Sequence, residues 1–201
     1  MKNVMADPLH LSLWFPQFDA TEILPRVLSV LRVFPYSAEQ PGISYLSLHP
    51  ISWIEPTILE QQFRPSITAE QAILLCANLL HEDHAYVFEA FWDLWMASPD
   101  GQESTLQPSP VKFIAHGLEF DEGVYEQAGH IQIDFGIDSS FLQEQAQLTS
   151  DAEERVRANV HKLVQFINQV EQNCATSARL LWSESEENFA QKLIGRLQKI
   201  Q

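Results

Sequence analysis

The stretch HAYVFEAFWDLWM, residues 84–96, decides the fold, because its aromatic and β-branched residues favour a strand that runs through the core. Successive side chains of a strand point to opposite faces of its sheet. One face of this strand is wholly apolar and is therefore predicted to be buried. It carries Tyr86, Phe88, Ala90, Trp92, Leu94 and Met96.

The opposite face of the same strand supplies the candidate binding residues. Glu89 and Asp93 alternate there with Phe91 and Trp95, which is typical of a half-covered surface, an interface or the wall of a cleft. Carboxylates among aromatic rings also suit a sugar site. However, four residues of strand separate the two acids by roughly 13 Å, whereas paired glycosidase carboxylates lie roughly 5 to 9.5 Å apart. The two acids alone therefore cannot be a catalytic pair.

Alternation and turn residues predict the other strands. These lie at 9–15, 43–48, 111–120 and 130–137, with 179–182 as a strand or a linker. The second of them is expected to resume at 51–54, and the region 56–65 is ambiguous. Turn formers predict a loop over 98–110. The polar segment 121–129 is expected to close a hairpin, which makes this part of the sheet antiparallel.

Helix-capping patterns predict four helices. They begin at Asp19, Thr68, Ser150 and Ser183, each followed by a Glu or Gln three residues later and by apolar residues at helical spacing. The helix that starts at Ser150 has the most regular apolar stripe, which runs from Val156 to Val170.

These elements predict a single α+β domain over residues 1–201. Its sheet is expected to be mixed, largely antiparallel and five- to six-stranded, with helices packed mainly on one face. A weak internal repeat suggests a further organisation into two ferredoxin-like β-α-β units. The units would begin at His10 and at His130.

Those two histidines lie in short stretches that resemble the paired His-x-Thr/Ser strands of two-histidine phosphoesterases. The stretches are His10-Leu-Ser12 and His130-Ile-Gln132. The resemblance implies that two imidazoles act as general base and general acid on a phosphodiester. The second copy has Gln132 where the family has a hydroxyl, so the simpler interpretation is two strand histidines.

Composition limits the class of partner. Among 201 residues, 27 acidic and 12 basic side chains give a net charge of −15. Nucleic acids and anionic membranes attract positive surfaces, so neither is an expected partner. The N-terminus resembles no secretory signal, and the longest apolar run, 72–80, is too short to span a bilayer. The chain is therefore expected to be cytoplasmic, with Cys76 and Cys174 as buried apolar groups.

The densest group of potential metal ligands is His81-Glu-Asp-His84. Imidazole and carboxylate groups bind zinc or manganese. The two histidines, however, lie between a predicted helix and a predicted strand and need not converge, and the chain has no HExxH pattern. No metal and no cofactor are therefore expected.

No sequence signature identifies a reaction, so it is uncertain whether this chain is an enzyme. The leading hypothesis is a non-enzymatic cytoplasmic protein-interaction domain with an acidic surface, which binds a protein partner or forms a homodimer. The alternative is a small-molecule-binding or hydrolytic domain with a carboxylate- and histidine-lined cleft near Glu89, Asp93 and His116. A deep pocket that contains two of these three groups would favour the alternative, and a flat apolar patch would favour the leading hypothesis.

Overall fold

The computed structural model describes residues 7–97, 104–141 and 150–183. Its strands are β1 (Pro8–Trp14), β2 (Ile43–Pro50), β3 (Leu59–Ile67), β4 (His84–Ala97), β5 (Ser104–His116), β6 (Ile131–Ile137) and β7 (Ala178–Ser183). Its α-helices are α1 (Ala20–Val33), α2 (Ala69–Cys76), α3 (Tyr125–Ala128) and α4 (Ser150–Asn173). Three short 3-10 turns, η1 (Ala77–Leu79), η2 (Phe120–Glu122) and η3 (Asp138–Ser140), complete the order.

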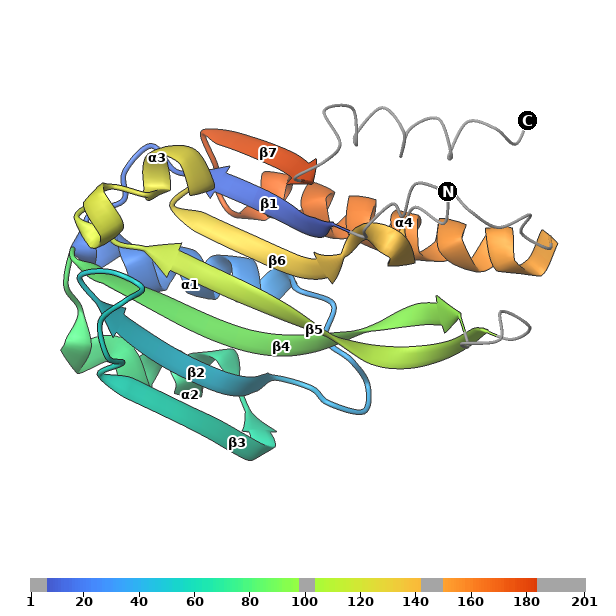
Figure 1. Ribbon diagram of the computed structural model, residues 1–201, viewed down its shortest axis with the longest axis horizontal. Helices are drawn as coiled ribbons and strands as arrows, with labels where there is room; N and C mark the ends of the chain where they lie inside the picture. Colours follow the sequence, from blue (N-terminus) through green and yellow to red (C-terminus); the bar gives the residue numbers. More distant parts are fainter. Residues whose placement is uncertain (1–6, 98–103, 142–149, 184–201) are drawn as a thin grey trace.

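All seven strands belong to one sheet, in the order β3-β2-β4-β5-β6-β1-β7. Helices α1, α2 and α4 lie behind this sheet in Figure 1 and contribute to one continuous core with it. The predicted α+β class is confirmed. The predicted five- to six-stranded mixed sheet is wrong, because every neighbouring pair is antiparallel and the ambiguous region 56–65 contributes the edge strand β3.

The predicted pair of ferredoxin-like units is also wrong. The connection from β1 through α1 to β2 passes three intervening strands, β6, β5 and β4. The connection from β6 through α4 to β7 passes only β1. A local strand-helix-strand pattern does not specify how many strands separate its two ends, so the two similar sequences form different crossovers.

The two faces of β4 are as the alternation predicts. Trp92 is completely buried, with its ring 5.8 Å from that of Phe34 and 5.2 Å from that of Phe135. On the opposite face, Glu89 and Phe91 are half-buried. The helices thus cover the apolar side of the sheet and leave the mixed side available for binding.

Capping side chains begin two of the predicted helices. The Asp19 carboxylate accepts the Thr21 N–H at 2.9 Å, and Thr68 forms a reciprocal capping box with Gln71 before α2. Helix α4 begins at Ser150 as predicted. No helix within the described ranges is long and apolar enough to cross a membrane.

Several predicted boundaries are wrong. Strand β5 already begins at Ser104, within the predicted loop, because it pairs with β4 from Ala85 to Ala97. The predicted hairpin segment 121–129 holds the end of η2 and all of α3 in place of a tight hairpin turn. Residues 51–54 form a loop and do not extend β2. The helix predicted after Ser183 lies outside the described residues.

Candidate functional site

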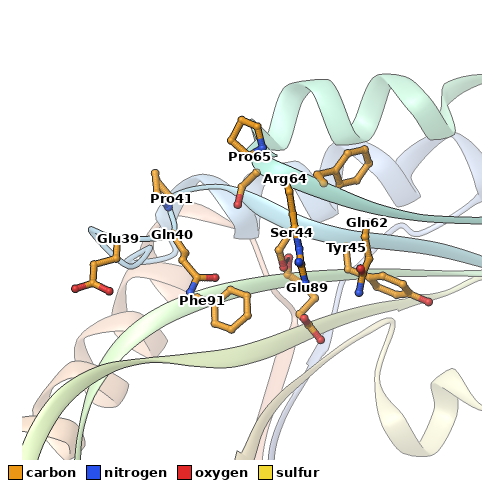
Figure 2. A pocket seen from close by; sticks show the side chains of 12 residues that line it. Glu39, Gln40, Pro41, Ser44, Tyr45, Gln62, Arg64, Pro65, Glu89 and Phe91 are labelled. Atoms are coloured by element: carbon orange, nitrogen blue, oxygen red, sulfur yellow. Dashed lines mark hydrogen bonds between the residues drawn. The ribbon is translucent and has the colours of Figure 1, made fainter.

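A groove of about 490 Å³ lies on the side of the sheet that the helices leave uncovered. Figure 2 shows its walls, which come from β2, β3, β4 and the segment 39–41. Two residues predicted from the sequence, Glu89 and Phe91, line it, together with Tyr45, Gln62 and Arg64. Two of the four candidate binding residues of β4 therefore line the groove.

An irregularity in strand pairing opens this groove. Ile43 of β2 pairs with Ile67 of β3, but the next pair along is Tyr45 with Gln62. Four residues of β3, 63–66, thus stand opposite a single residue of β2. Such bulges bend a strand away from its neighbour and are common beside binding sites. Gly42, at φ +91°, lies directly before β2, where a Cβ would collide with the Ile67 carbonyl oxygen.

Two opposite charges line the groove without pairing. No salt bridge joins either Glu89 or Arg64 to another residue of the described ranges. The Tyr45 hydroxyl donates to Glu60 at 3.1 Å, and partial burial raises the pKa of Tyr45. The groove thus offers a carboxylate, a guanidinium and the ring of Phe91 to a ligand.

Asp93 and Trp95 lie outside this groove and help to close the edge of β4. Strand β2 pairs with β4 only as far as Ala90, so the backbone beyond it needs other partners. The Asp93 carbonyl accepts from Lys162 Nζ at 2.7 Å. The side chain of Asn159 bonds both the N–H and the carbonyl of Trp95, at 2.9 and 2.8 Å. These two predicted site residues therefore anchor α4 to the sheet.

His116 is buried at the far end of β5, away from the groove. Glu89 pairs with Lys112, and four residues of strand separate Lys112 from His116 by about 13 Å. His116 Nδ1 lies 2.9 Å from the Gly129 carbonyl, and burial lowers the pKa of His116. The structure does not bring Glu89, Asp93 and His116 into one cleft.

A serine and a histidine, Ser47 and His49, lie in contact on β2. Ser47 Oγ is 3.0 Å from His49 Nε2, a distance suited to a nucleophile and its base. A catalytic triad also needs a third group that orients the imidazole through its other nitrogen. His49 Nδ1 is buried and has no hydrogen-bond partner in the described residues. The pair therefore does not form a triad.

The two histidines of the phosphoesterase resemblance do not form a common site. His130 Nδ1 accepts the Phe15 N–H at 3.0 Å, while His10 packs on Trp182 at a ring separation of 4.6 Å. On β1 and β6, His10 pairs with Asp134, four positions from His130. Four residues of strand correspond to about 13 Å, too far for both imidazoles to act on one phosphate.

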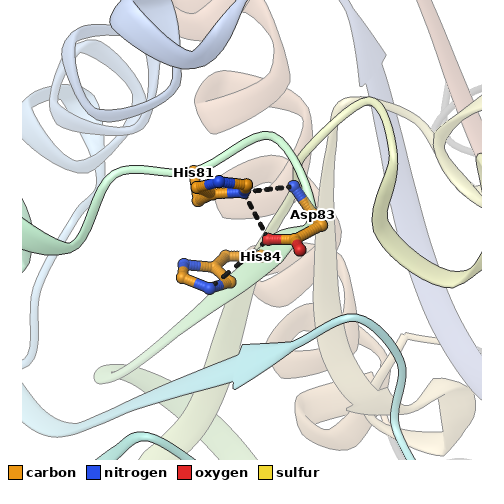
Figure 3. A group of neighbouring side chains, drawn as sticks. All are labelled: His81, Asp83 and His84. Carbon is orange, nitrogen blue, oxygen red and sulfur yellow. Dashed lines mark hydrogen bonds and ion pairs between the residues drawn. The ribbon is translucent and has the colours of Figure 1, made fainter.

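The side chains of His81, Asp83 and His84 lie close together. The expectation of no metal rested on the argument that the two histidines need not converge, and that argument is wrong. One ligand atom from each residue lies within 4.8 Å of the other two (Figure 3). His81 Nδ1 is 2.6 Å and His84 Nε2 is 3.4 Å from the same oxygen, Asp83 Oδ1. A turn of only four residues holds all three.

A further surface that the sequence analysis missed is the loop between β2 and β3, residues 51–58, here called the apolar loop. Four of its large apolar side chains are exposed: Ile51 by 58%, Trp53 by 41%, Ile54 by 91% and Ile58 by 49%. The sequence did contain a signal for this surface. Ile51, Trp53 and Ile54 lie between Pro50 and Pro56, and two prolines this close disfavour the interior of a strand, so these apolar residues belong to a loop.

Comparison of this chain with known protein families, with curated proteins and with solved structures finds no significant match.

Proposed function

We propose that this chain is a non-enzymatic cytoplasmic protein-interaction domain, and that the apolar loop is where it binds its partner. The observation that carries the proposal is the exposure of four large apolar side chains within eight residues. Exposed apolar groups gathered in this way are typical of interaction surfaces. Two free, buried cysteines, Cys76 and Cys174, fit a reducing compartment such as the cytoplasm.

Hydrogen bonds hold the apolar loop in one conformation. The Ile51 N–H donates to the Asp83 carbonyl and the Ile51 carbonyl accepts from the Asp121 N–H, both at 2.7 Å. The Ile58 N–H donates to the Leu48 carbonyl at 2.9 Å. Ile51 itself has a φ of +60°, which costs a β-branched residue about 1 to 3 kcal/mol. A loop fixed in this way loses little entropy when it binds.

The charge of the surroundings indicates the chemistry of the partner. Between residues 51 and 60 the chain has two acids, Glu55 and Glu60, and no lysine or arginine. The whole chain carries a net charge of −15. Complementary charge at an interface speeds association and excludes wrong partners. We therefore expect an apolar patch with a basic rim on the partner, and binding that weakens as salt concentration rises.

Site-specific photo-crosslinking in cells tests this assignment. A photoreactive residue at Ile54 should give one reproducible crosslinked protein, and the same residue at Leu74 should not. Leu74 is the matched control because it is an apolar side chain, 71% exposed, on α2. The crosslinked protein, purified, should bind the wild-type chain directly.

Substitutions at the same two positions then distinguish a specific contact from nonspecific hydrophobic association. Because Ile54 is 91% exposed, Ile54→Ser should leave folding unchanged and weaken binding by at least tenfold. Leu74→Ser should leave binding unchanged. Equal crosslinking at both positions, or equal effects of both substitutions, would refute the proposal. A crosslink to a second copy of the chain would identify the partner as the chain itself.

The groove favours a second candidate function, the binding of a small molecule. Its unpaired Glu89 and Arg64 suit a ligand that carries both a cationic and an anionic group, with an apolar part against Phe91. Such compounds should raise the melting temperature of the wild-type chain but not that of Glu89→Gln. Glu126→Gln, a change of an exposed acid on α3, is the matched control. The absence of any stabilising compound among zwitterionic ligands would count against this function.

A further inference from the structure

We propose that His81, Asp83 and His84 form a binding site for a divalent transition-metal ion, for which Zn²⁺ is the best fit. The ligand atoms would be Asp83 Oδ1 and the two imidazole nitrogens nearest to it, His81 Nδ1 and His84 Nε2. None of the three ligands lines the groove, and the site adjoins the apolar loop, because the Ile51 N–H donates to the Asp83 carbonyl at 2.7 Å.

The spacing of the three ligand atoms fits a coordination sphere. Zinc bonds to nitrogen and oxygen are about 2.0 to 2.2 Å long, so neighbouring ligand atoms around a tetrahedral ion lie about 3.3 to 3.6 Å apart. Asp83 Oδ1 is already 3.4 Å from His84 Nε2 and 2.6 Å from His81 Nδ1. A small rotation of the His81 side chain, which is 61% exposed, would admit the ion.

The tautomer of His84 leaves the correct nitrogen for a metal. His84 Nδ1 lies 3.0 Å from the Leu79 carbonyl oxygen, which can only accept, so Nδ1 carries the proton. In the neutral ring, Nε2 then presents its lone pair toward Asp83. Metal-binding histidines commonly donate their second nitrogen to a backbone carbonyl in this way, which fixes the ring orientation.

The carboxylate oxygen of Asp83 lies against both imidazoles. Asp83 Oδ1 is shielded from solvent, and it lies 2.6 Å from His81 Nδ1 and 3.4 Å from His84 Nε2. At 2.6 Å an imidazole nitrogen and a carboxylate share a proton in a charge-assisted hydrogen bond. A cation bound by this oxygen and the two nitrogens would replace that proton and would neutralise the carboxylate.

The turn that carries the ligands is fixed on both sides. The carbonyls of Glu82, Asp83 and His84 accept hydrogen bonds at 2.8, 2.7 and 2.9 Å, from residues of the apolar loop and of the β5–β6 connection. Gly117 permits the close approach, because a Cβ there would collide with the carbonyl oxygens of Glu82 and His84. A rigid backbone of this kind presents the three ligands with little reorganisation.

The ligand set selects among metals. Two imidazoles with one carboxylate suit zinc and its neighbours, whereas Ca²⁺ and Mg²⁺ prefer sites made wholly of oxygen. Three protein ligands leave the remaining positions of the ion to water or to another molecule.

Calorimetric titration of the chelator-treated, full-length chain with Zn²⁺ tests the site. We expect one ion per chain, at least tenfold weaker binding in His81→Gln, and little response to Mg²⁺. His81→Gln should fold normally because the side chain is largely exposed. His161→Gln, which changes an exposed histidine on α4, is the matched control and should bind like the wild type.

Melting curves test the more buried ligand, His84, whose substitution can also affect folding. Zn²⁺ should raise the melting temperature of the wild type and of His161→Gln, and should raise it less in His84→Gln. No one-to-one binding event would refute the site. So would equal affinity in His81→Gln and the wild type, or equal binding of Mg²⁺.

Discussion

At the scale of single residues, His130 shows how burial selects a protonation state. Its ring stacks between those of Phe18 and Tyr125, at centroid distances of 4.4 and 5.0 Å. Because Nδ1 accepts the Phe15 N–H, the folded ring is neutral. Burial, together with the smaller effect of the neighbouring His116, lowers the pKa of His130 to about 4.

This lowered pKa predicts a loss of stability in acid. In the unfolded chain the pKa of His130 returns to about 6.5. The stability that the neutral ring contributes is complete above pH 6.5 and is lost as the pH falls toward 4. Between pH 7 and pH 5, the wild type should lose about 1 to 2 kcal/mol more unfolding free energy than His130→Asn, which cannot titrate.

Urea unfolding at the two pH values measures this difference. Asparagine is the suitable replacement because its side-chain oxygen can still accept the Phe15 N–H. Identical pH dependence in the two proteins would show that His130 does not titrate as its environment predicts.

At the scale of secondary structure, α4 completes the edge of β4 that β2 leaves unpaired. Asn159 is 2% exposed, and its amide group makes three hydrogen bonds of 2.8 to 2.9 Å, two to the backbone of Trp95 and one to the Ser140 carbonyl. A side-chain amide thus substitutes for a neighbouring strand. This accounts for the half-buried state of Trp95, whose ring also lies 5.1 Å from the Arg155 guanidinium.

Removal of this contact should weaken the whole fold. Asn159→Leu keeps a similar volume but removes the side-chain partner of three backbone groups, of which the Ser140 carbonyl bond is buried and the two Trp95 bonds are partly buried, so it should lower the free energy of unfolding by about 2 to 4 kcal/mol. Asn168→Leu, the same change at an exposed position of α4, should alter it by less than about 0.5 kcal/mol. Urea unfolding compares the two, and a loss below about 1 kcal/mol in Asn159→Leu would contradict the role of this side chain.

At the scale of the whole molecule, the net charge of −15 bears on self-association. A homodimer through the mixed face of β4, near Phe91 and Trp95, stays a prediction. Two copies of like charge repel one another, and salt screens that repulsion. Dimerisation should therefore strengthen between low and high salt, and Trp95→Asp should keep the chain monomeric at both.

Sedimentation at several concentrations decides the question. A wild type that is monomeric at high micromolar concentration in both salt conditions would remove the homodimer. If Trp95→Asp unfolds, Trp95 acts as a structural residue that joins β4 to α4.

Local periodicity allowed the sequence to predict the α+β class, the buried face of β4 and the starts of α1, α2 and α4. These features depend on residues two to four positions apart, so the neighbouring side chains alone determine them. The same reasoning placed Glu89 and Phe91 on a face open to ligands, where the structure has a groove.

Only the tertiary structure decided the strand order, the edge strand β3, the bulge that opens the groove and the exposure of the apolar loop. It also separated His116 from Glu89 and brought His81, Asp83 and His84 together. The strand order and the separation of His116 from Glu89 depend on backbone pairing between segments far apart in the chain, and distant segments also hold the turn at 81–84, as the hydrogen bond from Ile51 to Asp83 shows. The alternation of residues along a strand determines which face of the sheet each side chain points to. Which strand lies beside it, and in which register, depends on the packing of the whole sheet.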